Sequence, residues 1–161
     1  MFGGLEATAK AITTGTYNLL VEQQWDSLVA RPDMISHAVS ELLRFAPPIG
    51  PARVVTRDAV LRDVPLCAGQ MAVLDVASAC RDSRQYDDAE ILDIAREPGR
   101  QLAFGAGPHF CLGANLAKVT LETAFATLTH RFPELQLTDA DSIEWDHDTF
   151  HGIVELPVLV S

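Results

Sequence analysis

Residues 104–113 decide the fold of this chain, and they read Phe104-Gly105-Ala106-Gly107-Pro108-His109-Phe110-Cys111-Leu112-Gly113. This glycine-rich loop brings a single cysteine to the start of a helical run that extends from Leu112 to about Arg131. The start of a helix has unpaired N–H groups and a partial positive charge, which suit an anionic side chain. The thiolate is the form of cysteine that binds metals. Because Gly113 leaves room for a flat group close to the backbone, the stretch predicts a thiolate ligand beside a flat cofactor.

Other interpretations of this cysteine fit the residues less well. A lone cysteine is more often a small buried side chain than a ligand, and only the surrounding loop reverses that preference. A dinucleotide-binding loop would need glycine where Phe110 stands. Zinc is disfavoured because Cys67, Cys80 and Cys111 lie far apart and form no Cys-x-x-Cys pair. The sequence contains no Gly-x-Ser-x-Gly motif of a serine hydrolase.

The bulk composition indicates an ordinary globular chain. Its 161 residues are 48% hydrophobic and 21% charged, which allows one domain with a hydrophobic core. The net charge of −10 disfavours a nucleic-acid partner and would attract a positively charged redox partner. Three irregularly spaced cysteines favour a reducing compartment. The chain has neither a secretory leader pattern nor an apolar run of the ~20 residues that span a membrane, so we expect a cytoplasmic protein.

The loop resembles the haem-ligand loop of the cytochromes P450. The family order Phe-x-x-Gly-x-x-x-Cys-x-Gly is filled by Phe104, Gly107, Cys111 and Gly113. The resemblance implies haem b as the cofactor, with Cys111 as the axial thiolate ligand of its iron and Gly105 in the same binding loop.

Two further residues match positions where the family contacts the haem propionates. His109 precedes the cysteine by two residues, and Arg53 lies in an extended run over residues 49–57. Arginine suits such a task because its planar fork pairs bidentately with a carboxylate. Each could instead be an ordinary loop or strand side chain.

The first predicted helix, over residues 4–24, resembles the P450 helix that crosses the distal side of the haem. There the family has an acid followed by threonine, which together deliver protons during dioxygen activation. Glu6 matches the acid, but Ala7 stands at the threonine position and Thr8 follows one residue later. Since a helix turns about 100° per residue, Thr8 does not simply replace its neighbour. We expect Glu6 and Thr8 to be the catalytic residues, although an ordinary amphipathic helix would give the same pattern.

A second P450 hallmark is Glu41-Leu42-Leu43-Arg44. It lies in a predicted helix that ends at a pair of prolines. An acid and a base three residues apart share one helical face, and such pairs are usually solvated surface. The resemblance implies a buried structural ion pair. In the family, a later arginine is the third partner of this pair. Ile91 stands at the matching position of this sequence, so either Arg81, Arg84 or Arg96 takes the place of that arginine, or the network is reduced.

The predicted fold class is mainly α with small β-sheets. Further helices are expected over 25–30, 34–45 and 75–81, and the helix after Cys111 should be buried along a wide face that includes Leu116 and Val119. Strands are expected over 59–61 and 70–74 around a Pro65–Gly69 turn, with two more in the tail, at 135–137 and 152–160. Residues 82–101 form an irregular meander.

The order of these segments resembles the C-terminal portion of the P450 fold: distal helix end, Glu-x-x-Arg helix, β hairpins, meander, cysteine-ligand loop and proximal helix. Residues 1–161 are therefore expected to form a single partial domain of a bacterial-type enzyme whose N-terminal part is absent. The resemblance implies a haem-thiolate monooxygenase that acts on a small organic substrate with electrons from a ferredoxin-type partner, the fragment alone being inactive. The alternatives are a non-catalytic remnant that serves as an interaction module, and a peroxide-using or oxidative-coupling P450.

Overall fold

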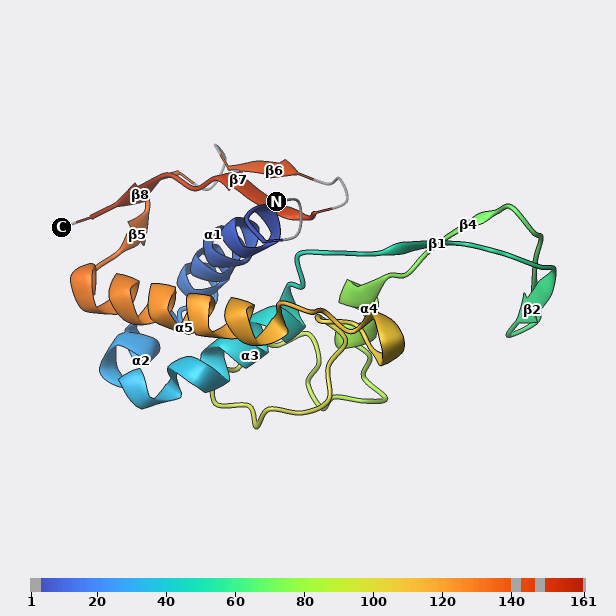
Figure 1. The fold of residues 1–161 in the computed structure, drawn as a ribbon. Helices are drawn as coiled ribbons and strands as arrows, with labels where there is room; N and C mark the ends of the chain where they lie inside the picture. Colours follow the sequence, from blue (N-terminus) through green and yellow to red (C-terminus); the bar gives the residue numbers. More distant parts are fainter. Residues whose placement is uncertain (1–3, 140–142, 147–149, 161) are drawn as a thin grey trace.

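Three long helices carry the core. In a computed structural model that describes residues 4–139, 143–146 and 150–160, α1 (Glu6–Val21), α3 (Ile35–Phe45) and α5 (Ala114–Arg131) pack against one another (Figure 1). The short α2 (Trp25–Ala30) covers one end of this bundle. The core between the helices is apolar, and its largest fully buried side chains include Leu19, Leu28, Val39 and Phe125. This burial supplies the main favourable free energy of the fold.

Within the described residues, the chain forms four small antiparallel sheets of two strands each. They pair β1 (Ala52–Val54) with β4 (Met71–Val73), β2 (Ala59–Leu61) with β3 (Val64–Leu66), β5 (Gln136–Leu137) with β8 (Val158–Leu159), and β6 (Glu144–Asp146) with β7 (Gly152–Glu155). The fold is therefore mainly α with small β-sheets, as the sequence predicts.

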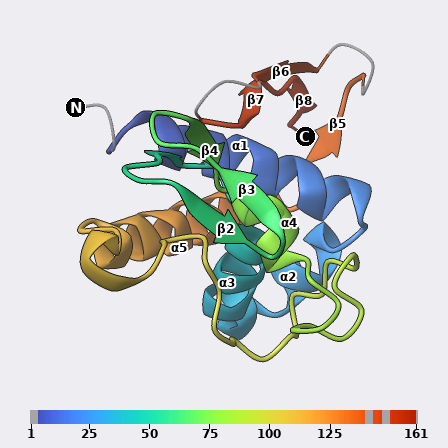
Figure 2. The same cartoon turned by 90° about the vertical axis from the view of Figure 1, so that its right-hand side faces the viewer.

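Residues 52–74 form an arm that extends away from the helices. Figure 1 shows β1 and β4 leading outward to the β2–β3 hairpin, which Figure 2 shows from its free end. The arm carries apolar side chains that are exposed: Val54, Val60, Leu61, Val64, Met71 and Val73. Exposed apolar side chains gathered along one arm mark a surface suited to contact with other groups.

The segment between the arm and α5 is irregular. It begins with the short α4 (Val76–Cys80), whose N-cap Asp75 accepts a hydrogen bond from the Ser78 N–H at 2.9 Å. It ends in a single 3-10 turn, Gly107–His109, just before the cysteine. Between them the chain forms turns without regular structure, as the sequence predicts for residues 82–101.

Three expectations about local structure are wrong, wholly or in part. Pro65 lies in β3 opposite Val60, and the turn forms at Arg62 and Asp63, both of which have positive φ. The sequence gives little sign of that turn, because Arg-Asp lacks the glycine that usually marks such a hairpin. Strand β6 was not expected at all.

The wide buried face predicted for α5 is also wrong in part. Leu121 and Phe125 are buried, but Leu116 and Val119 are exposed.

No helix among the described residues is long and apolar enough to cross a membrane.

Strand β7 lies directly on α1. Gly152 has φ of +151°, and a Cβ at this position would lie 2.8 Å from Cβ of Lys10 and 2.9 Å from Oγ1 of Thr14. Both atoms lie close to the α1 backbone, so neither can move aside as the end of a long side chain could. Only glycine lets the strand approach the helix this closely.

We therefore predict that Gly152→Ala lowers the free energy of unfolding by about 1–3 kcal/mol, because the added methyl overpacks the junction. Urea unfolding followed by circular dichroism measures the change. The matched control is Gly99→Ala, since a Cβ at Gly99 would meet nothing within 4 Å and the backbone φ is not positive. Equal stability of the two variants would contradict the close approach.

Candidate functional site

The loop that carries Cys111 is closed by its own backbone. The Cys111 N–H donates to the Phe104 carbonyl at 2.9 Å, and the Gly105 N–H donates to the Leu102 carbonyl at 2.8 Å. Gly105 and Gly107 have φ of +71° and +69°, a conformation that glycine adopts without strain. The loop therefore holds the cysteine next to Phe104 and at the start of α5.

The surface around the Cys111 side chain is open and apolar. The thiol itself is exposed, as are the neighbouring side chains of Phe110, Leu112 and Leu116. A Cβ at Gly113, the N-cap of α5, would meet nothing within 4 Å. An exposed sulfur set in an apolar surface with open space beside it fits a flat, apolar metal cofactor such as haem.

No larger metal-binding cluster competes with this cysteine within the described ranges. There, no group of three or more His, Cys, Asp or Glu side chains could hold a metal ion.

The two side chains expected at haem propionates lie on different segments. His109 is exposed in the 3-10 turn of the cysteine loop. Arg53 is exposed in β1 at the base of the arm, where its Nη1 donates to the Ala52 carbonyl at 2.8 Å. Both offer hydrogen-bond donors to a ligand that approaches from solvent.

The residues expected to act in catalysis lie in the first turn of α1. Glu6 is exposed, and its Oε1 accepts a hydrogen bond from Nζ of Lys10 at 3.2 Å. The Thr8 hydroxyl lies 3.4 Å from the Gly4 carbonyl of its own helix, to which it donates. Ala7, between them, offers no polar group. The acid therefore has a cationic partner, while the threonine hydroxyl is turned back to its own backbone.

Glu41 and Arg44 form a buried ion pair, each residue 3% exposed. The Arg44 Nε donates to Glu41 Oε2 and its Nη2 donates to Oε1, both at 2.7 Å. This is the bidentate geometry in which a guanidinium and a carboxylate pair most strongly. Hydrogen bonding to Glu41 raises the pKa of Arg44 although burial opposes it, so the arginine stays charged.

The third partner of this pair is Arg96. Its Nε donates to Glu41 Oε1 at 3.1 Å. The other two arginines considered are engaged elsewhere: Arg81 binds the Phe45 carbonyl and Glu90, and Arg84 pairs with Asp82. The sequence left open whether Arg81, Arg84, Arg96 or none of them is the third partner, and the structure shows that it is Arg96.

Arg44 also binds the irregular segment through main-chain carbonyls. Its Nη1 donates to the carbonyls of Cys80 and Ala89 at 2.9 and 2.8 Å, and its Nη2 donates to that of Ile91 at 3.1 Å. Ile91 therefore contributes its backbone where the family alignment suggested a side chain. These bonds fasten a segment without regular structure to α3.

Sequence reasoning missed the role of Cys80. Its side chain is fully buried, and the backbone of Leu102 and Ala103, just before Phe104, lies close enough to influence its pKa. Burial raises the pKa of the Cys80 thiol. Because the Cys80 carbonyl binds Arg44, this residue links the buried ion pair to the entry of the cysteine loop. Nothing in the spacing of the three cysteines signals that contact.

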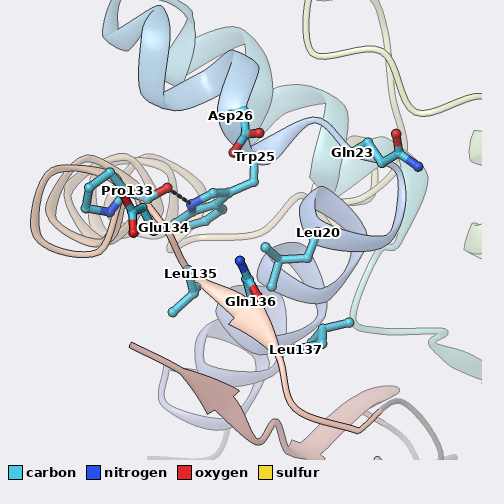
Figure 3. A pocket seen from close by; sticks show the side chains of 9 residues that line it. All are labelled: Leu20, Gln23, Trp25, Asp26, Pro133, Glu134, Leu135, Gln136 and Leu137. Atoms are coloured by element: carbon cyan, nitrogen blue, oxygen red, sulfur yellow. Dashed lines mark hydrogen bonds between the residues drawn. The ribbon is translucent and has the colours of Figure 1, made fainter. Parts of the chain in front are cut away.

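One hollow of the described surface lies far from the cysteine. It encloses about 490 Å³ between Leu20, Trp25, Pro133 and Leu135 (Figure 3), where the Trp25 Nε1 donates to the Pro133 carbonyl at 3.2 Å. This is the opposite end of α5, whose 18 residues span ~27 Å. None of the expected site residues lines it, so it is not the site that the cysteine loop forms.

Comparison with known proteins assigns the family. The sequence profile described as "Cytochrome P450" matches residues 21–158, so the chain belongs to the cytochrome P450 family. It is 38% identical over 163 residues to the polyketide biosynthesis cytochrome P450 PksS of Bacillus subtilis (strain 168). It is 39% identical over 165 residues to nocardicin C N-oxygenase of Nocardia uniformis subsp. tsuyamanensis. Both alignments cover 98% of this chain.

Solved structures agree with the sequence comparison. The crystal structure of CalO2 superposes with a TM-score of 0.93 at 34% identity, over 99% of this chain and 41% of CalO2. The chain spans about 40% of the length of the curated relatives that it matches, namely 40% of PksS and 41% of nocardicin C N-oxygenase. The fold described above is thus the C-terminal portion of the P450 fold.

The buried ion pair yields a test. Arg44→Ala should destabilise the chain by about 3–5 kcal/mol, because the Glu41 carboxylate would lose its bidentate partner while buried. Urea unfolding measures the loss, or the yield of soluble protein if the variant no longer folds. Arg84→Ala is the control, since Arg84 is exposed and should change the stability little. A small loss for both variants would contradict a structural role of the pair.

The three cysteines should differ in reactivity. We expect a thiol reagent at neutral pH to modify Cys67 and Cys111, which are exposed, far faster than Cys80. Burial both shields Cys80 and raises its pKa, which lowers the reactive thiolate fraction. Mass spectrometry of the labelled peptides gives the three rates. Cys67→Ser is the control and should leave Cys111 as the fast site; rapid labelling of Cys80 would contradict the packing behind the loop.

Proposed function

We propose that this chain forms the haem-ligating part of a P450 monooxygenase, with Cys111 as the axial thiolate ligand of haem b. The observation that carries the proposal is the exposed Cys111 thiol in an open apolar surface at the start of α5. A soluble chain rarely leaves large apolar side chains around a free thiol unless something covers them. The family membership supports haem as that group.

The residues of the loop would hold the sulfur in a fixed position. The rings of the half-buried Phe104 and the exposed Phe110 have centroids 6.4 Å apart. The hydrogen bond from the Cys111 N–H to the Phe104 carbonyl fixes the backbone that carries the thiol. His109 and Arg53 would donate to the propionates. Haem, when bound, supplies the dioxygen chemistry, while the protein supplies position, protons and exclusion of water.

Helix α1 would supply the proton path. Glu6 is the ionisable group of this segment that stands at the family's acid position, and it is accessible to water. With Ala7 beside it and the Thr8 hydroxyl bound to the Gly4 carbonyl, water would carry the proton between Glu6 and the reacting groups. General acid–base assistance of this kind typically contributes about 10²–10⁴ in rate.

The same residues favour a second candidate. A peroxide-using or oxidative-coupling P450 could dispense with the hydroxyl that Ala7 lacks. The absence of that hydroxyl is the observation in its favour. A non-catalytic remnant remains the third interpretation, and the haem-binding experiment below separates it from both enzymes.

The substrate and the electron donor are inferred from the relatives and from charge. The names of PksS and nocardicin C N-oxygenase indicate work on small organic molecules, which supports a substrate of that class. A ferredoxin-type protein would deliver electrons on the cysteine side. The net charge of −10 would favour a positively charged partner face. We place the enzyme in the cytoplasm. The 161 residues would form one partial domain, which needs the N-terminal part of the P450 fold to enclose its haem.

The test is a chimaera in which this chain follows the N-terminal part of PksS that precedes their aligned region. The chimaera, loaded with haem, should give the strongly red-shifted Soret band of a reduced carbon monoxide complex with thiolate ligation. Cys111→Ser should abolish that band, and Cys67→Ser should leave it unchanged. The chain by itself should not bind haem stoichiometrically, because it provides only part of the walls.

Thiol labelling supplies a readout that does not depend on activity. Haem should protect Cys111 of the chimaera from the reagent that modifies it in the free chain, while Cys67 stays reactive. A folded chimaera that binds no haem would support the remnant and overturn the proposal.

A further inference from the structure

Lys10 is a buried charge that the proposed chemistry does not use. The sequence has two lysines; Lys118 is exposed, whereas Lys10 is 7% exposed in the middle of α1. A buried ammonium is costly unless acceptors surround it. Here Nζ donates to Glu6 Oε1 at 3.2 Å, to the Phe150 carbonyl at 2.7 Å and to Asp146 Oδ2. An ammonium has three donors, and all three are used.

These three acceptors come from separate parts of the chain. Glu6 lies one turn earlier on α1, Asp146 ends β6, and Phe150 precedes β7. One ammonium thus binds the proposed acid and both sides of the C-terminal hairpin, which we define as β6 and β7. The hydrogen bond to Asp146 is the main cause that raises the pKa of Lys10, so the lysine is charged at neutral pH.

The next turn of α1 continues the same junction. The Thr13 hydroxyl donates to the Ile153 carbonyl at 2.8 Å, and the Ile153 N–H donates to the Thr14 hydroxyl at 3.1 Å. Both backbone polar groups of a buried residue are therefore satisfied by helix side chains. Gly152 allows the close approach that these bonds need. The hairpin and α1 behave as one body at this point.

We propose that Lys10 is a positioning residue: its ammonium holds the Glu6 carboxylate and the C-terminal hairpin in one charge cluster, so that the acid and the hairpin move together. The assignment of a proton-delivery role to Glu6 rests on the proposed function; the cluster itself rests on contacts. Two carboxylates share one ammonium, and Asp146 is the more buried of the two, with 26% of its side chain exposed against 47% for Glu6. Asp146 therefore anchors Lys10, and Lys10 places Glu6.

The first experiment observes the ammonium directly. In a ¹⁵N spectrum of lysine ammonium groups, Lys118→Met removes the other lysine and leaves the signal of Lys10. Glu6→Gln and Asp146→Asn should each shift this signal, because both carboxylates accept from Nζ. Glu90→Gln is the matched control, since Glu90 is an exposed carboxylate that pairs with Arg81. The shift caused by Glu6→Gln should become much smaller in the Asp146→Asn background if the hairpin sets the contact.

The second experiment follows the hairpin. Lys10→Met should speed amide exchange of Ile153 about tenfold or more, because losing the cluster lets the hairpin open locally. Trp145 in β6, whose ring lies 5.5 Å from that of Tyr17 on α1, reports the same opening through its quenching by acrylamide. Trp25→Phe isolates its emission, and Lys118→Met is the control for a lysine outside the cluster. Lys10→Arg should restore both readouts, since it keeps the charge.

The outcomes separate this inference from the proposed function. The positioning role is overturned if Lys10→Met leaves the exchange rate of Ile153 unchanged. It is also overturned if Glu6→Gln does not shift the Lys10 signal. The amide exchange of Ile153 is followed both in the chain and in the haem-loaded chimaera, so a chain that fails to fold alone does not prevent the test. A chimaera without the thiolate Soret band would instead refute the proposed function, whatever Lys10 does.

Discussion

The buried charge of Arg44 is the constraint on which the rest of the structure depends. A guanidinium that loses water must find an acceptor for each of its donors, and α3 alone offers only Glu41. The remaining acceptors are the carbonyls of Cys80, Ala89 and Ile91. Arg96 in turn binds Glu41 and the carbonyls of Asp87 and Asp88. A segment with no regular structure is in this way given a single conformation by side chains rather than by a backbone ladder.

The position of the cysteine loop depends on that network. The Cys80 carbonyl binds Arg44, and the Gln101 Nε2, three residues before Phe104, donates to the Ser40 carbonyl of α3 at 3.2 Å. The loop then closes through the bond between Cys111 and Phe104. Polar contacts thus fasten the segment before the loop to α3, and the loop's own backbone bond positions Cys111. Because each contact is buried or local, we expect the loop to be rigid even where its outer side chains face solvent.

How far the sequence predicts this structure depends on the range of the interaction. Most helices are local patterns, and they are predicted correctly from neighbouring residues. The spacing of Glu41 and Arg44 predicts that they share a helical face, but only the family resemblance implied that the pair is buried. Arg96 could not be chosen over Arg81 or Arg84, because no periodicity governs a segment folded by carbonyl contacts. The sequence gives no sign of the role of Lys10, since its partner Asp146 lies 136 positions away. Leu116 and Val119 show that an apolar side chain indicates burial without saying what covers it.

The hydroxyls of Thr13 and Thr14 have a consequence for how this protein can change over time. They occupy both polar groups of Ile153, so the helix serves as the neighbouring strand that β7 lacks on this side. A single residue inserted between Lys10 and Thr14 would rotate the hydroxyls by about 100° and translate them by about 1.5 Å. No compensating change in the strand alone would restore both bonds. Insertions and deletions should therefore accumulate in the exposed arm and be purged from this short stretch of α1, which makes its length a more durable signature than most of its side chains.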